Sequence, residues 1–152
     1  MKELNGSAST GVSAPIEDCF ALLIDLERYP AWYPETVREA TVTQRDAGGH
    51  PSMVRTTLHA SIGPLAHEFH LLMAVLSSRP TRVKLTRVPH DAGDRERFEV
   101  TWRLEPAAGT RISVDLAANL SLPRLLPVGG VGDAMAGGFV RAAANAVSGA
   151  KP

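Results

Sequence analysis

Residues 14–34 read APIEDCFALLIDLERYPAWYP and carry the strongest indication of the fold. The first half predicts a short helix, because Pro15 suits the first helical position, where a missing N–H costs nothing. Glu17 and Asp18 then favour the positive end of the helix dipole. One apolar face at helical spacing completes the pattern, formed by Ile16, Phe20, Leu23 and Ile24.

The second half of this stretch is aromatic and interrupted by proline. Pro30 and Pro34 are expected to stop the helix, and Tyr29, Trp32 and Tyr33 cluster around them. Two interpretations stay open. The aromatic side chains are ordinary core residues, or Trp32 and Tyr33 form a lid that closes over a bound ligand.

The same stretch resembles the beginning of START-like (SRPBCC) domains of the polyketide cyclase/dehydrase and coenzyme Q-binding type. The similarity rests on a small residue followed by Pro-Ile-Glu at 14–17, on Phe20, and on the segment from Asp25 to Pro34. It implies an α+β helix-grip fold, in which a curved antiparallel sheet of about seven strands wraps around a long C-terminal helix. For function it implies only a range, because such domains include lipid carriers, cyclases and proteins of no known activity.

The composition is that of a single domain, residues 1–152, large enough to bury a core without a disulfide or a metal. Cys19 is the only cysteine and lies in the predicted helix, so we expect a buried thiol. The first residues lack the apolar run of a signal peptide, and no apolar stretch of about eighteen residues exists to span a membrane. These features predict a cytoplasmic protein.

The charge balance argues against nucleic acid as a partner. Sixteen basic residues match sixteen acidic ones, whereas phosphate backbones attract proteins with a basic surplus or stripe. The glycines at 129–132 are followed by neither Lys-Ser nor Lys-Thr, so they do not form a phosphate cradle, and we expect no cofactor. The nearest approach to a basic stripe falls on both faces of a predicted strand and comprises Arg79, Arg82, Lys84 and Arg87.

Alternating apolar runs separated by turn signals predict one strand before the helix and six after it. The predicted strands are Leu4–Val12, Val37–Arg45, Met53–Ile62, Leu65–Leu76, Arg82–Val88, Arg97–Glu105 and Arg111–Leu120. Short turns between consecutive strands imply an antiparallel meander. The Ala-rich segment 123–150 predicts a closing helix, so the order of elements supports the helix-grip fold independently of the motif.

The strand register follows from aligning apolar residues, because a shift by one residue would expose an apolar face. A turn at Gly63-Pro64 predicts the pairs Leu58–Phe69, Thr56–Leu71, Val54–Met73 and Ala60–His67. The last hairpin predicts Trp102–Val114, Val100–Leu116 and Leu104–Ile112. The concave face is then almost wholly apolar, and we expect it to line a pocket with Thr56, Leu58, Phe69, Leu71, Met73, Leu85, Phe98, Val100 and Trp102.

The final helix would add Met135 and Phe139 to this pocket, but most of its other residues are Gly or Ala. Gly137 and Gly138 each disfavour a helix by about 1 kcal/mol relative to Ala. Either such small residues let the helix lie close on the sheet, or they leave volume for a hydrophobic ligand. The apolar loop at 122–131 either packs against the aromatic segment or serves as a gate, a dimer contact or a membrane-touching edge.

Few polar groups are candidates for chemistry. Strand alternation places Arg87 on the concave face. A guanidinium there would hold a carboxylate, phenolate or carbonyl group of a ligand, unless the side chain reaches out to water. His67 is either a hydrogen-bonded rim residue or a general acid or base, although no carboxylate lies beside it on that face. On the outer face, His59, Glu68 and His70 could ligate a metal, but a His–Glu cross-strand pair is ordinary surface chemistry. We expect no metal site and no catalytic residue.

These observations predict that the protein binds, and transports or sequesters, a hydrophobic small molecule such as a lipid, an isoprenoid or a polyaromatic compound in an internal cavity. Arg87, His67 and Thr56 would orient the polar end of that ligand. The resemblance also allows a polyketide aromatase/cyclase, in which Arg87 and His67 would assist enolisation and dehydration. A protein-interaction module is the third possibility. Transient membrane contact is compatible with the sequence, and the oligomeric state stays open.

Overall fold

The computed structural model describes every residue except 1, 63, 123–125, 127 and 150–152. Within the described residues, seven strands form one antiparallel sheet in the order β1-β7-β6-β5-β4-β3-β2. The strands are β1 (Lys2–Val12), β2 (Val37–Arg45), β3 (Pro51–Ile62), β4 (Leu65–Ser78), β5 (Arg82–Arg87), β6 (Arg97–Ala107) and β7 (Gly109–Leu120). The helices are α1 (Ile16–Ile24), the 3₁₀ helix η1 (Leu26–Arg28), α2 (Tyr29–Trp32) and α3 (Val131–Gly149).

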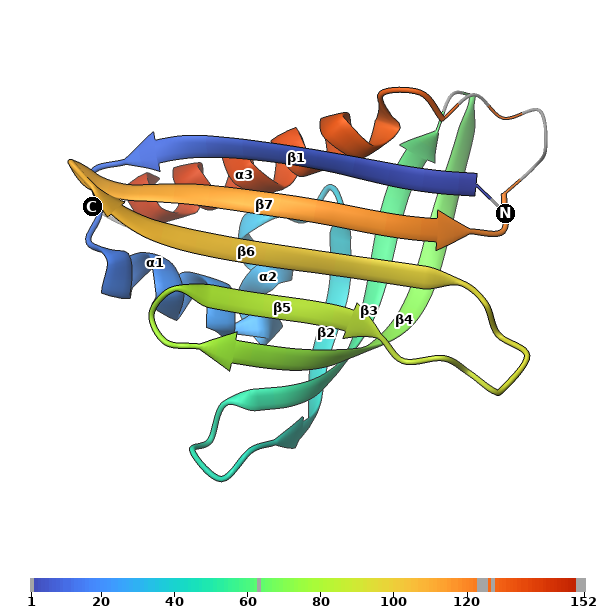
Figure 1. The fold of residues 1–152 in the computed structure, drawn as a ribbon, viewed down its shortest axis with the longest axis horizontal. Helices are drawn as coiled ribbons and strands as arrows, with labels where there is room; N and C mark the ends of the chain where they lie inside the picture. The colour runs from blue at the N-terminus through green and yellow to red at the C-terminus, as the bar shows by residue number, and fades with distance from the viewer. Residues whose placement is uncertain (1, 63, 123–125, 127, 150–152) are drawn as a thin grey trace.

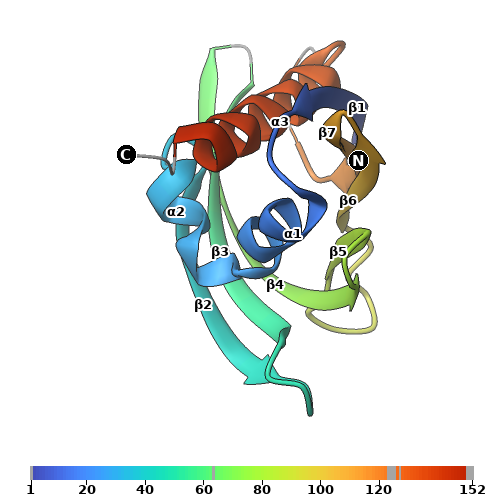
Figure 2. The ribbon, with the colours of Figure 1, turned by 90° about the vertical axis from the view of Figure 1, so that its left-hand side faces the viewer.

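The sheet is strongly twisted and curved. In Figure 1, β2 and β3 run steeply across the direction of β5, β6, β7 and β1, and β4 bends from the one direction into the other to run alongside β5. Figure 2 shows all three α-helices on the concave side, with α1 inside the curve. The long helix α3 packs mainly on β1 and β7, whereas α1 packs on β5, β6 and β7. The predicted helix-grip fold is confirmed, and α1 shares the concave side with α3.

The predicted register is confirmed in both hairpins. In the first, Leu58 lies opposite Phe69 and Thr56 opposite Leu71, as the alignment of apolar residues requires. In the second, Trp102 lies opposite Val114. Apolar residues on the concave side are therefore buried together with α1 and α3 in one core, whose largest fully buried side chains include Trp102, Phe98 and Leu23.

Most strands begin or end one or two residues away from the predicted boundary, and two differences at helix or strand ends have a clear physical cause. The sequence predicts that Pro30 stops a helix, but α1 ends earlier, at Ile24, and Pro30 lies in the first turn of α2. A proline is tolerated there because the first N–H groups of a helix have no intrahelical partner. The sequence also predicts strands that end at Glu105 and begin again at Arg111, but pairing continues to Ala107 and Gly109. Gly109 has a φ of 114°, a conformation that side chains rarely adopt, and so permits the tight reversal.

Small residues bring α3 close to β1. A Cβ atom on Gly132 would collide with the backbone of Asn5, and one on Gly6 would collide with the backbone of Gly132. The Asp133 carboxylate accepts a hydrogen bond of 3.1 Å from the backbone N–H of Ser7, which fixes the same end of the helix. At these positions the small residues serve close packing of helix on sheet rather than leaving volume for a ligand.

The apolar loop before α3 packs inward where it is described. Leu126 is buried in the core, and Leu122, Val128 and Val131 pack against that core, whereas Leu125 lies outside the described residues. Cys19 is buried, as expected, and burial raises the pKa of its thiol. Among the described residues, none of the helices combines the length and the apolar character needed to cross a membrane.

Candidate functional site

An internal void of about 30 Å³ lies between the concave face of the sheet and the helices. Its floor comes from β3, β4, β5 and β6, one wall from η1, α2 and β2, and its cover from α3. The lining residues are Leu26, Tyr29, Val37, Ala40, Thr56, Leu58, Met73, Leu85, Phe98, Val100, Trp102 and Phe139.

The void brings together more than half of the residues that the sequence predicted for a ligand pocket. They come from four strands and from α3, and the strand residues face the void in the register that the sequence predicts. The eight predicted residues that line the void are Thr56, Leu58, Met73, Leu85, Phe98, Val100, Trp102 and Phe139.

Sequence reasoning missed four lining residues. Leu26 and Tyr29 belong to η1 and α2, which the sequence suggested only as an aromatic segment. Val37 and Ala40 have opposite parity in the sequence, so simple strand alternation cannot place both on one face. A register shift between Val37 and Glu39 inserts the extra residue that turns Ala40 inward, opposite Thr56.

The void is small because aromatic side chains fill the space around it. Phe139 packs edge-to-face on Trp102, with 6.0 Å between ring centroids, and on Tyr33, with 5.0 Å. Its volume suits about one water molecule, whereas pockets for small organic ligands measure about 300–1,000 Å³. A drug-sized molecule therefore fits only if parts of the wall move.

Three lining residues carry a hydrogen-bonding nitrogen or oxygen in the side chain. The Tyr29 hydroxyl donates to the carbonyl oxygen of Leu23 at 2.7 Å, and the Thr56 hydroxyl donates to that of Leu71 at 3.2 Å. Trp102 is fully buried, and its indole N–H lies near the Tyr29 hydroxyl without reaching full hydrogen-bond geometry. Burial raises the pKa of Tyr29, although the neighbouring indole of Trp102 acts in the opposite direction.

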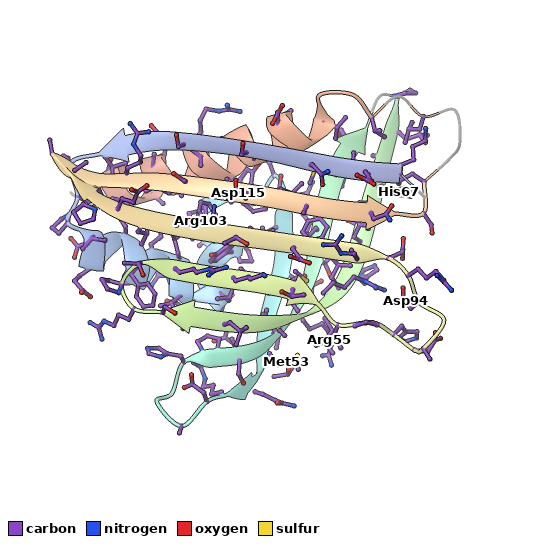
Figure 3. The ribbon with its side chains drawn as sticks, in the orientation of Figure 1. Met53, Arg55, His67, Asp94, Arg103 and Asp115 are labelled. Carbon is purple, nitrogen blue, oxygen red and sulfur yellow. The ribbon has the colours of Figure 1, made fainter. Side chains whose placement is uncertain are left out.

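Arg87 occupies the strand position that the sequence predicts for the concave face, but its guanidinium is bound by protein groups. It lies opposite Met73 in the register, and its side chain is 11% exposed. The guanidinium donates to the Asp94 carboxylate at 2.5 Å and to the carbonyl oxygen of Glu96 at 3.0 Å. Arg87 is absent from the lining of the void, since the loop after β5 supplies acceptors at the end of the strand. Figure 3 labels Asp94 where the chain passes from β5 to β6.

The ion pair explains two shifts in ionisation. Hydrogen bonds from Arg87 and from the backbone N–H of His90 hold the pKa of Asp94 well below its usual range. The same carboxylate raises the pKa of Arg87. Leu71, another predicted pocket residue, is buried but borders a shallow surface pocket beside this loop rather than the internal void.

His67 and Phe69 pack against each other and not around the void. His67 lies opposite Ala60, as predicted, and its half-buried ring packs edge-on against Phe69 at 5.3 Å. Neither residue lines the void. Met135 is half-buried against the core and is also absent from the lining.

Trp32 and Tyr33 stack on each other and line a surface groove of about 1,070 Å³ between α1, α2 and α3. They do not line the internal void that the predicted lid would close, and of the three aromatic residues in this segment Tyr29 lines it. Five of the fifteen residues that line the groove are charged: Asp18, Asp25, Arg28, Glu35 and Arg141.

The outer face carries the predicted pair of a His and a Glu residue, which are not arranged as metal ligands. His59 lies opposite Glu68, and the Nδ1 atom of His70 is 3.2 Å from the Thr57 hydroxyl oxygen. Among the described residues, no three His, Cys, Asp or Glu side chains come together as ligands for a metal ion.

Comparison with known families and structures gives a consistent picture. Residues 12–145 match the family model described as polyketide cyclase/dehydrase and lipid transport. No curated protein sequence is similar enough to count as a match.

Solved structures share the fold at low sequence identity. A START superfamily protein from Mycobacterium smegmatis is 20% identical, with a TM-score of 0.70, over 98% of this chain and 99% of that chain. A protein from Thermus thermophilus is 20% identical, with a TM-score of 0.68, over 99% of this chain and 100% of that chain. The di-domain ARO/CYC StfQ of the steffimycin biosynthetic pathway is 12% identical, with a TM-score of 0.67, over 97% of this chain and 51% of that chain.

Proposed function

We propose, since the chain belongs to the polyketide cyclase/dehydrase and lipid transport family, that it binds a hydrophobic small molecule between its curved sheet and its helices. The observation that carries this proposal is the lining of the internal void, in which nine of twelve side chains have no hydrogen-bonding nitrogen or oxygen. Burial of an apolar ligand there would be favourable by about 25 cal/mol per Å² of apolar surface removed from water.

Binding requires the void to expand. One wall is built from η1 and α2, which contribute Leu26 and Tyr29 and together span only residues 26–32. η1 is tied to β2 by the exposed carboxylate of Glu27, which accepts from the Val42 backbone N–H and from Arg45, each at 3.3 Å. We propose that this short segment opens, at the cost of the buried hydrogen bond from the Tyr29 hydroxyl to the Leu23 carbonyl. Because only open molecules bind, the apparent affinity is the intrinsic affinity multiplied by the fraction of molecules that are open.

The surface groove beside Trp32 is a poorer site for such a ligand. Its volume is sufficient, but five charged side chains line it, and an apolar molecule placed there would remove them from water without offering partners. The internal void therefore supports a hydrophobic ligand better than the groove does.

The lining favours binding without a reaction. Tyr29 is its only titratable residue among those described, and burial raises the pKa of that phenol. Arg87 and His67, the residues that a cyclase would use, lie outside the lining. The solved ARO/CYC relative supports the shared fold alone, so carriage of a hydrophobic ligand is the function that we propose.

A matched pair of substitutions tests the site. Ala40→Leu adds side-chain volume at the void, whereas Ala74→Leu makes the same change on the outer face of β4, opposite Met53. Native mass spectrometry and titration with a panel of lipids and polyaromatic compounds should show a bound molecule in the wild type. We expect Ala40→Leu to weaken binding at least about tenfold and Ala74→Leu to leave it unchanged.

Two results would contradict the proposal. The first is that no compound of the panel binds to the folded wild-type protein. The second is that Ala40→Leu and Ala74→Leu bind equally well, which would place the ligand outside the void.

A further inference from the structure

The polar side chains around the internal void face groups of the protein. The Tyr29 hydroxyl donates to the Leu23 carbonyl at 2.7 Å, and the Thr56 hydroxyl donates to the Leu71 carbonyl at 3.2 Å. The indole N–H of Trp102 lies near the Tyr29 hydroxyl. Among the described lining residues, no polar atom faces the void. A hydroxyl, carbonyl or charged group that entered the void would therefore lose its hydration without finding a partner.

The internal void and the surface groove share a wall that is formed by η1, α2 and α3 (Figure 2). Tyr29 lines the void, and its neighbour Arg28 lines the groove. On α3, Phe139 lines the void and its neighbour Gly138 lines the groove. Tyr33 lines the groove while its ring packs on Phe139 at 5.0 Å. The two spaces therefore join when η1 and α2 move, which is the opening that the proposed function requires.

The groove suits a polar group as well as the void suits a hydrocarbon. Its lining holds three carboxylates and two guanidinium groups, and all five of these side chains belong to exposed residues. The two arginines, Arg28 and Arg141, form no ion pair among the described residues. A polar group placed in the groove keeps its contact with water and gains charged neighbours of both signs.

We propose that the site takes an amphiphile with a single polar end, whose hydrocarbon chain enters the internal void while the polar end stays in the groove beside Arg141. This inference rests on the proposed function, because it names the class of molecule that the void takes. A polyketone fits such a site poorly, because carbonyl groups recur along its chain and some of them would lie in the void without a donor.

The first test compares dodecanol with the dodecanediol that carries a hydroxyl at both ends. Whichever end of the diol enters the void, a hydroxyl is buried without a partner. We expect the diol to bind between about 5- and 150-fold more weakly than dodecanol, the range that one unpaired buried polar group costs in proteins. Isothermal titration below the micelle concentration measures both dissociation constants, and Ala40→Leu, which adds volume at the void, should weaken binding of dodecanol.

The second test locates the polar end by its charge. Arg141→Gln removes a positive charge from the groove, whereas Arg55→Gln makes the same change at an exposed position on the outer face of β3, labelled in Figure 3. At low ionic strength, Arg141→Gln should weaken binding of dodecanoate about three- to fivefold and strengthen binding of dodecylammonium by a similar factor. Binding of dodecanol should change little, and Arg55→Gln should leave all three ligands unaffected.

The outcomes distinguish this inference from the proposed function. If none of these ligands binds to the wild type, or if Ala40→Leu leaves binding of dodecanol unchanged, the proposed function fails. If dodecanol binds at the void but the diol binds equally well, or if Arg141→Gln affects the charged ligands no more than Arg55→Gln does, the placement of the polar end is wrong while the hydrophobic site stands.

Discussion

Gly138 shows how one missing methyl group sets the packing of the longest helix. A Cβ atom at this position would collide with the hydroxyl oxygen of Tyr33, whose ring in turn packs on Phe139 at 5.0 Å. The glycine carries a helix-propensity penalty of about 1 kcal/mol relative to Ala, and the close approach of Tyr33 offsets it. The small Gly138 thus allows Tyr33, the residue that follows α2, to pack on Phe139 of α3.

A double-mutant cycle tests this pairing. Gly138→Ala should be neutral or destabilising in the wild type, because the Tyr33 hydroxyl must move. In a Tyr33→Phe background, which removes that oxygen, it should raise the free energy of unfolding by up to about 1 kcal/mol. Urea denaturation of the four proteins measures the coupling. Equal effects of Gly138→Ala in both backgrounds would show that the hydroxyl is not the obstacle.

Gly137 provides the matched control in the same helix. A Cβ atom there would lie 3.1 Å from Nη1 of Arg141, the end of a flexible side chain that can turn away. Gly137→Ala should therefore stabilise the protein by up to about 1 kcal/mol whether or not residue 33 carries a hydroxyl.

The loop between β5 and β6 is held together by the partly buried ion pair of Arg87 and Asp94. Asp94 accepts from Arg87 at 2.5 Å and from the backbone N–H groups of His90 and Glu96 at 2.8 and 3.1 Å. These hydrogen bonds lower the pKa of Asp94 in the folded protein. A lowered folded-state pKa stabilises the fold above the unfolded value, about 3.9 for Asp, and the stabilisation is lost as pH falls below it.

Asp94→Asn should therefore reduce the free energy of unfolding at pH 7, and the difference from the wild type should shrink as the pH is lowered below about 4. Chemical denaturation at pH 7 and at pH 3 measures both differences. Glu105→Gln, an exposed position on β6, is the control and should show little change at either pH. A loss of stability with Asp94→Asn that is the same at both values would rule out the charge as its cause.

The part of the chain that the structure describes has one core, to which the sheet and the helices α1, α2 and α3 contribute. We expect one cooperative thermal transition, with equal calorimetric and van't Hoff enthalpies and a total of about 100 kcal/mol near 60 °C. Differential scanning calorimetry tests this. Two separable transitions would show that part of the chain, such as α3, unfolds independently.

The polarity pattern along the chain was enough to predict the fold and the floor of the site. Alternating apolar residues allow only one register in each hairpin, because a shift by one residue would place the apolar set in water. This pattern alone places Thr56, Leu58, Met73 and Trp102 on one face, and the structure gathers them around the void.

Side-chain partners and the volume of the interior depended on three-dimensional packing. Parity assigns Arg87 to the concave face, but the position of its guanidinium depends on Asp94, seven residues away in a loop without periodicity. Ala40 faces inward only because of a register shift that local residue preferences do not reveal. The void measures about 30 Å³ because Phe139, Trp102 and their neighbours meet there. Such close packing depends on the positions of all the elements at once, so no single stretch of sequence encodes it.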